Sequence, residues 1–253
     1  MFIDSHCHLD DPLLADRLPE VFTAAARAGV ERFVVPGVGP EGWPRIASLA
    51  RREQSVHGAF GLHPLHASLF TPALLDELAR YLPHAVAVGE IGLDYTYANV
   101  SRTVQQESFR AQLRLAIAHG LPVLIHCRRA FADLFRILRE EQAERVGGVM
   151  HAFSGSLEIA RECPGLGLYL SVAGTVTYEN AVRPVEVVRQ LHLDRLLLET
   201  DSPDMTPEPH RGQPNEPAFL AEIALKVADI RGISPAEVAA ATTANAERLF
   251  HLE

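Results

Sequence analysis

Short runs of valine, isoleucine and leucine alternate along the chain with longer segments whose apolar residues recur every three or four positions. Runs of the first kind are typical of buried strands, and segments of the second kind are typical of amphipathic helices. The apolar runs predict eight strands, near Phe2–Ser5, Arg32–Val35, Val56–Gly61, Ala85–Gly89, Val123–His126, Gly148–His151, Leu168–Ser171 and Leu196–Thr200.

The periodic segments between these runs predict helices. They cover Leu13–Ala28, Ala73–Tyr81, Val104–His119, Phe131–Gln142 and Val182–Leu191, and two further helices, Glu216–Arg231 and Pro235–Phe250, close the chain. The last of them has a clear start signal, because Ser234 can cap it, Pro235 suits the first helical position and Glu237 completes a capping box.

Eight strands that are each followed by a helix favour a TIM-type (β/α)₈ barrel, formed as a single domain over residues 1–253 with an extra C-terminal helix. A doubly wound open sheet is the alternative fold. The first strand, however, is not followed by the glycine-rich phosphate loop that such a sheet usually carries.

Metal-ligand residue types follow the predicted strands repeatedly, at the strand ends where a barrel of this kind builds its active site. His6 and His8 end the first strand and, two positions apart, would project from the same face. The candidate ligands are His6, His8, Glu90, His126, His151 and Asp201. A single histidine is more often a core residue, but this coincidence at several strand ends favours a metal centre.

Four imidazoles and two carboxylates are too many ligands for one four-coordinate ion and suit two divalent cations. Many barrel hydrolases bridge two metals with a carbamylated lysine, but the one lysine, Lys226, lies in a late helix. Glu90 is therefore the expected bridge, and Asp201 could bind one metal and accept a proton from the attacking water. The ligand set fits Zn, Mn, Fe or Co, and added Mg could also activate the enzyme.

Composition narrows the function further. The formal net charge of −9 argues against a broad basic surface that binds duplex nucleic acid. The three widely spaced cysteines do not suggest a disulfide framework or a thiolate zinc site. Neither a secretory signal nor a membrane-spanning segment is recognisable, so a cytoplasmic enzyme is expected. Arg128 and Arg211 are candidate phosphate donors and His63 is a candidate substrate contact.

Eight short motifs resemble those of the TatD-family deoxyribonucleases, which are related to the metal-dependent amidohydrolases, from Ile3 to Phe250. They are Ile3–Leu9, Gly61–Pro64, Gly89–Tyr95, Pro122–Arg128, His151–Gly155, Leu198–Pro203, Arg211–Pro217 and Asn245–Phe250. The resemblance implies a TIM barrel that hydrolyses DNA phosphodiesters at two metals, as a 3′–5′ exonuclease on single-stranded ends. It also implies that the six candidate ligands bind the metals.

Two other functions are consistent with parts of the pattern. An amidohydrolase-type enzyme could cleave a C–N or ester bond at the same centre, because a fold does not determine a function. A non-catalytic binding protein would be expected to have lost ligands, and none is missing. We expect a monomer that acts on DNA. We expect Glu199 to support the ligands from the inward face of the last strand and Asn215 to cap the following helix.

Overall fold

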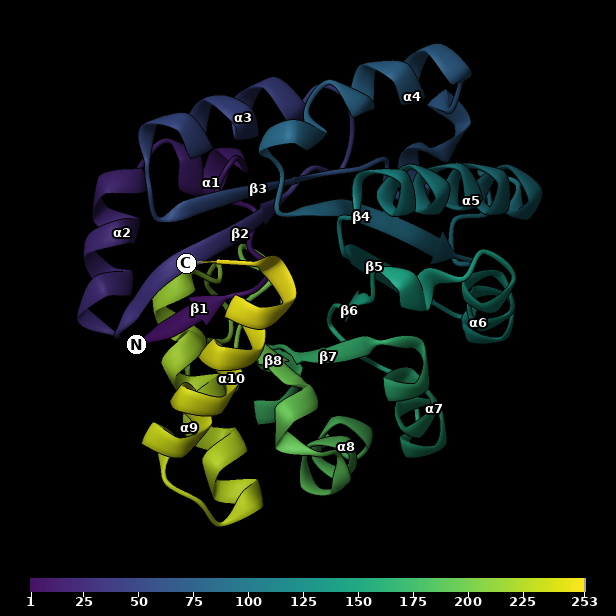
Figure 1. Ribbon diagram of the computed structural model, residues 1–253. Coiled ribbons are helices and arrows are strands. Elements are labelled where there is room, and N and C mark those ends of the chain that lie inside the picture. The colour runs from purple at the N-terminus through teal and green to yellow at the C-terminus, as the bar shows by residue number, and fades with distance from the viewer. Residues whose placement is uncertain (253) are drawn as a thin grey trace. The chain divides into compact units, whose positions relative to one another are not determined.

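The computed structural model describes residues 1–252, in which eight parallel strands form one sheet and sequence neighbours are also neighbours in the sheet. The strands are β1 (Phe2–Asp4), β2 (Val30–Pro36), β3 (Val56–Phe60), β4 (Ala87–Asp94), β5 (Val123–Arg128), β6 (Gly148–Met150), β7 (Leu168–Val172) and β8 (Leu196–Leu198) (Figure 1). This strand order with intervening helices is the (β/α)₈ topology of the TIM barrel. The predicted fold is therefore confirmed.

Helices connect the strands and follow the last one. They are α1 (Pro12–Ala15), α2 (Leu18–Arg27), α3 (Trp43–Arg52), α4 (Pro72–Ala79), α5 (Arg102–His119), α6 (Phe131–Glu140), α7 (Leu157–Glu162), α8 (Arg183–Gln190), α9 (Leu220–Arg231) and α10 (Pro235–Phe250). Both α9 and α10 follow β8, which confirms the extra C-terminal helix. Among the described residues, no helix combines the length and the apolar character that crossing a membrane requires.

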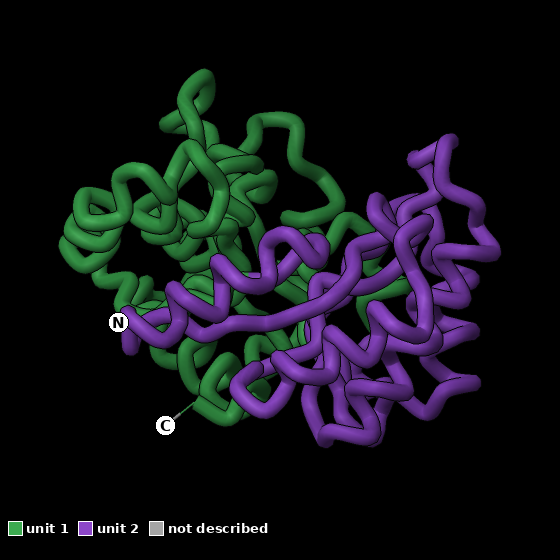
Figure 2. Tube along the Cα trace, turned by 90° about the horizontal axis from the view of Figure 1, so that it is seen from above, with its two compact units in different colours: residues 1–35, 151–161, 169–253 green, residues 36–150, 162–168 purple. Residues whose placement is uncertain are grey.

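The chain divides into two compact units, which are coloured separately in Figure 2. Unit 1 consists of residues 1–35, 151–161 and 169–253, and unit 2 consists of residues 36–150 and 162–168. In unit 1, α10 packs against β1, β8 and α9. In unit 2, α3 packs on β3, α5 on β4 and α6 on β5. The strands supply fully buried aliphatic side chains to both cores, such as Leu197 in unit 1 and Leu124 in unit 2.

Two predicted helices differ from the structure by more than a shift of one or two residues at an end, and proline explains both differences. The helix expected over Leu13–Ala28 is broken into α1 and α2, because Pro19 occupies the first turn of α2 and cannot continue a preceding helix. The helix expected from Glu216 begins only at Leu220, after a 3₁₀ turn that starts at Pro217. A residue that precedes proline is disfavoured in the helical conformation.

The β4–β5 pair brings several candidate site residues together. Gly92 of β4 lies opposite His126 of β5, and Asp94 lies opposite Arg128. A Cβ atom on Gly92 would lie 1.9 Å from the His126 carbonyl oxygen, and the φ angle of Gly92 is +147°. Only glycine permits this approach, so Gly92 is what allows the ends of β4 and β5 to lie so close.

Candidate metal centre

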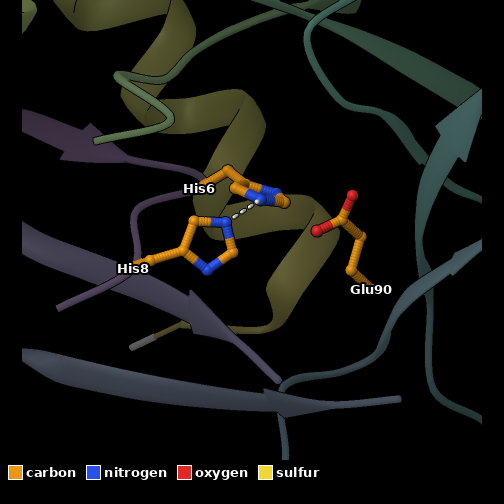
Figure 3. Close-up of side chains that lie close together, drawn as sticks. All are labelled: His6, His8 and Glu90. Atoms are coloured by element: carbon orange, nitrogen blue, oxygen red, sulfur yellow. Dashed lines mark hydrogen bonds between the residues drawn. The ribbon is translucent and has the colours of Figure 1, made fainter. Parts of the chain in front are cut away.

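His6 and His8 follow β1 in unit 1, and their imidazoles meet edge to face. Their Nε2 atoms are 3.3 Å apart, and Figure 3 shows the two rings joined by this contact. Their ring planes make an angle of 81°. β1 ends at Asp4, so the alternation of a strand does not place the two rings side by side. The predicted proximity is correct, but the strand-based reason for it is wrong.

The loop after β8 places Asp201 beside these two rings. Backbone hydrogen bonds run from Ser5 N to Leu198 O (3.0 Å), from Asp201 N to His6 O (2.9 Å) and from His8 N to Ser202 O (2.8 Å). As a result, Oδ1 of Asp201 lies 3.5 Å from Nε2 of both imidazoles. Burial opposes ionisation of Asp201, but a hydrogen bond with His8 and the nearby histidine charges lower its pKa overall.

Two buried side chains hold this loop in place. Asp4 Oδ1 accepts hydrogen bonds from the backbone nitrogens of Thr200 (2.9 Å) and His6 (3.3 Å), and Oδ2 accepts one from the Thr200 hydroxyl (2.6 Å). Burial raises the pKa of Asp4 to about 7, against the opposing effect of these hydrogen bonds. Asn215 Nδ2 donates to the carbonyl oxygens of Thr200 (2.8 Å) and Asp204 (2.7 Å). Asn215 therefore braces the loop, and its side chain does not cap a helix.

His151 and Glu199 complete the donor groups of unit 1. The His151 ring stacks on the His6 ring with a centroid distance of 4.1 Å. Glu199 Oε1 accepts a hydrogen bond from Ala152 N (2.6 Å) and lies 3.5 Å from His151 Nδ1. Its Oε2 is buried without a hydrogen-bond partner among the described residues. One donor atom each from His6, His151 and Glu199 lies within 4.8 Å of the others.

Glu199 and Asp201 do not reach these positions as neighbours on one strand face. β8 ends at Leu198, and Asp201 has a φ angle of +55°, in the left-handed region. The predicted strand Leu196–Thr200 is therefore too long at its end. Instead, the irregular backbone directs Glu199 toward His151 and Asp201 toward His6 and His8.

A second donor group lies in unit 2, at the ends of β3, β4 and β5. Glu90 Oε1 lies 3.0 Å from His126 Nδ1 and 3.5 Å from His63 Nε2. One donor atom from each of the three residues lies within 4.8 Å of the others. His63 Nδ1 accepts a hydrogen bond from Leu65 N (3.1 Å), which leaves the Nε2–H of His63 facing Glu90.

Asp94 is a buried carboxylate in this group that the sequence analysis did not assign. Its Oδ2 lies 3.0 Å from His126 Nε2, and its Oδ1 accepts hydrogen bonds from Thr96 N (2.8 Å) and Thr96 Oγ1 (2.5 Å). Burial opposes ionisation, but the hydrogen bonds from His126 and Thr96 lower the pKa of Asp94 to about 2. The sequence could have indicated Asp94, because it lies in the Gly89–Tyr95 motif and ends the strand that carries Glu90.

The two arginines predicted to bind substrate are exposed, Arg128 in unit 2 and Arg211 in unit 1. Arg128 is exposed at the end of β5 and forms no ion pair with another described residue. Burial and the charges of Asp94 and Glu90 raise the pKa of Tyr97, and the Arg128 charge opposes this rise. The Tyr97 ring lies edge-on to His63 at 6.0 Å. Arg211 is exposed, lies 3.4 Å from Glu208 and covers the Tyr178 ring at 4.5 Å.

The donor atoms are imidazole nitrogens and carboxylate oxygens, which suit zinc, manganese, iron or cobalt. None of the candidate donor groups among the described residues includes a cysteine, and Cys7 is buried with its Sγ directed to the Val34 carbonyl at 3.9 Å. Burial also raises the pKa of this thiol well above its usual value. The donor geometry and the partnerless Glu199 oxygen fit a site that binds divalent cations.

Comparison with known proteins identifies the family. The family model described as TatD related DNase matches residues 3–251. The chain belongs to the TatD-related DNase family. Related sequences include the metal-dependent hydrolase YabD of Bacillus subtilis, 41% identical over the full length of both chains. Another is YcfH of Escherichia coli K12, 37% identical over 99% of this chain and 96% of YcfH.

A solved structure supports the same assignment for this TatD-family chain. The TatD homologue YJJV of Escherichia coli K12 superimposes with a TM-score of 0.95 at 37% sequence identity, covering 100% of this chain and 98% of YJJV. The family membership and these relatives make the chain a metal-dependent hydrolase. Its His and Glu clusters provide the donor atoms that such an enzyme requires.

Proposed function

We propose that this TatD-family hydrolase cleaves phosphodiester bonds at single-stranded DNA ends, as a 3′–5′ exonuclease, in a centre that binds two divalent ions. The observation that carries the proposal is the presence of imidazole–carboxylate donor groups at the carboxyl ends of the barrel strands in both units. The DNase description of the matching family model supports the choice of substrate.

We assign six ligands. His6, His8, His151 and Asp201 come from unit 1, whereas Glu90 and His126 come from unit 2, and Glu90 is the expected bridge. When bound, the ions would neutralise phosphate charge and lower the pKa of an attacking water.

The side chains have separate tasks in this proposal. Asp201 accepts the proton of the attacking water, since its low pKa keeps it ionised at neutral pH. Asp94 holds His126 with its Nδ1 directed toward Glu90. Arg128 binds a substrate phosphate through its guanidinium group. Arg211 and His63 also contact the substrate, and His63 does so from beside Glu90.

A single-stranded end suits the charge distribution. The chain has a formal net charge of −9, so its surface as a whole repels DNA. Arg128 and the bound cations would provide a local positive potential that attracts a phosphate group. A flexible end can enter such a local site, whereas a duplex would need a wider basic surface.

The proposal is tested with metal-replete protein and oligonucleotides labelled at either end. We expect 3′-labelled single-stranded DNA to release labelled mononucleotide first, and 5′-labelled DNA to shorten progressively. RNA, duplex DNA and simple amides or lactones should react more slowly. Far better cleavage of an amide or a lactone would contradict the proposal and favour an amidohydrolase-type reaction.

A pair of histidine variants controls this experiment. His126→Ala removes a proposed ligand and should abolish cleavage of every phosphodiester. His192→Ala removes an imidazole whose side chain is 88% exposed and which pairs with Asp194, so it should retain full activity. Equal activity of both variants would show that a contaminating nuclease performs the cleavage.

A further inference from the structure

A groove of about 360 Å³ lies in unit 1, between the loop that follows β6 and the loop that follows β7. The first loop contributes Phe153 and Ser154, and the second contributes residues between Thr175 and Pro184. Both loops leave the carboxyl ends of their strands. His151, Glu199 and Asp201 also follow the carboxyl ends of strands, so the groove belongs to the same face of unit 1 as these donors.

The groove is close to the proposed metal ligands. Phe153 follows His151 by two residues, so the two Cα atoms can be no more than about 8 Å apart. Phe153 N donates a hydrogen bond to Ser171 O (3.2 Å), which fixes this segment against β7. A substrate whose phosphate lies beside His151 would therefore place an adjoining group at the groove.

The lining combines apolar surface with a few polar groups. Phe153, Val182 and Pro184 supply apolar surface, and Val182 is 73% exposed. Thr175, Asn180 and Ser154 can form hydrogen bonds with a ligand, and the exposed Arg183 adds a positive charge to the lining. An apolar hollow with few polar groups is typical of small-molecule sites, and this volume is at the lower end of their range. It suits a single nucleoside.

A positive charge lies next to the groove. Tyr178 lines it, and the Arg211 guanidinium carbon lies 4.5 Å from the centre of the Tyr178 ring. The Tyr178 hydroxyl donates a hydrogen bond to Thr206 O (3.2 Å), which fixes the ring. Arg211 thereby provides a cation beside an apolar groove, the combination that a base and its neighbouring phosphate require.

We propose that this groove binds the base and sugar of the nucleotide on the 5′ side of the cleaved phosphodiester, while Arg211 contacts the phosphate on the far side of that nucleotide. This inference rests on the proposed DNA hydrolysis and adds a binding subsite to it. Recognition by apolar contact and stacking tolerates every base, because every base has a flat apolar face.

The first test compares substrates and variants of the metal-loaded enzyme. Val182→Asp places a negative charge at the groove, and Asn180→Ala removes a hydrogen-bonding group. Val182→Asp should raise KM for single-stranded DNA at least about fivefold, the lower end of the contribution of base stacking. Asn180→Ala should raise it by a smaller factor. Hydrolysis of methyl p-nitrophenyl phosphate, which has no nucleoside, should change less than about twofold.

A matched control separates the groove from general surface charge. Leu225 of α9 is also in unit 1 and is 51% exposed, but it does not line the groove. Leu225→Asp should leave KM for DNA unchanged. An abasic nucleotide on the 5′ side of the scissile bond should weaken wild-type binding, and Val182→Asp should add no further loss with that substrate.

The outcomes distinguish this inference from the proposed function. If the enzyme cleaves DNA but neither the variants nor an abasic nucleotide on the 5′ side changes KM, the nucleoside subsite is refuted and DNA hydrolysis stands. If the loaded enzyme cleaves other esters or amides but no DNA, both proposals fail. A KM increase confined to groove variants and relieved by the abasic substrate supports the subsite.

Discussion

Asp94 Oδ2 lies 3.0 Å from His126 Nε2, on the opposite side of the imidazole from the nitrogen that faces Glu90. An ionised carboxylate only accepts hydrogen bonds, so Nε2 of His126 must carry the proton. If this is the only proton on the ring, the lone pair of Nδ1 is available for a metal. Asp94 is not a proposed ligand, but its hydrogen bond determines which nitrogen of His126 can bind a metal.

We expect Asp94→Asn to weaken metal binding by roughly 10- to 100-fold. An amide has one accepting oxygen, whereas Asp94 accepts from Thr96 on one oxygen and from His126 on the other. If the amide oxygen keeps the Thr96 bonds, its NH₂ faces His126 and favours a proton on Nδ1. Nitrogen chemical shifts of the His126 ring in metal-free protein would measure this change.

Asp133→Asn is the control for this variant, because Asp133 is in the same unit and accepts a hydrogen bond from Tyr95 but does not contact His126. It should keep both the wild-type metal affinity and the His126 shifts. An unchanged His126 tautomer in Asp94→Asn would disprove the role that we assign to Asp94.

Metal content tests the bridging role of Glu90. Elemental analysis of protein prepared without chelators should approach two divalent ions per chain, and Glu90→Ala should lose most of this content. Glu77→Ala, an exposed change on α4 of the same unit, should have no effect. If Glu90→Ala protein still binds two ions per chain, Glu90 does not bridge them.

Asp201→Asn should lower kcat by at least about 100-fold while the fold and most of the metal are retained. Asparagine tolerates the left-handed backbone of Asp201, and its amide oxygen can still bind a metal but cannot take up the proton at neutral pH. Glu199→Gln should lose much less activity, because its amide oxygen can still accept from Ala152 N. Steady-state kinetics at matched metal content would compare the two variants with wild type. Near-normal turnover of Asp201→Asn would show that another residue is the general base.

Arg128→Ala should raise KM for DNA by about tenfold or more, the contribution of a hydrogen bond to a charged group. Metal content should not change, and the difference from wild type should shrink as salt concentration rises. Arg52→Ala, at the end of α3, serves as the control. A KM that does not respond to Arg128→Ala would show that another group binds the phosphate.

Ser234→Ala should lower the free energy of unfolding by about 1 kcal/mol, because Ser234 caps α10 and accepts a hydrogen bond from Glu237 N. Urea denaturation would measure the loss. Ser101 precedes α5 but makes no capping hydrogen bond through its side chain, so Ser101→Ala should cost much less. Equal losses in the two variants would argue against the capping box as the cause.

All eight strands and the capped start of α10 were predictable from the sequence, because each depends on local composition. Runs of valine, isoleucine and leucine locate the strands even though their ends differ by a few residues. The breaks at Pro19 and Pro217 show where apolar periodicity predicted helices that are too long. In both places, the backbone restriction of proline outweighs the apolar pattern.

The candidate site was predictable as a set of residue types but not as a geometry. The positions of Glu199 and Asp201 depend on a loop that leaves β8 at Leu198 and passes through a left-handed residue, and periodicity contains no signal for either. The role of Asp94 depends on the register of β4 and β5 at Gly92, which is a long-range contact.

Asn215 joins the two ends of the segment between residues 205 and 214. Asn215 binds the carbonyl oxygens of Thr200 and Asp204, and its backbone nitrogen donates to Pro203 O (2.9 Å). The two ends of the intervening segment are thus joined independently of its length, while the segment itself carries the exposed Arg211. Exchange of side chains that point away from these bonds, such as the exposed Arg211, should therefore leave Asp201 in place, so the segment is a suitable position for altering substrate contacts.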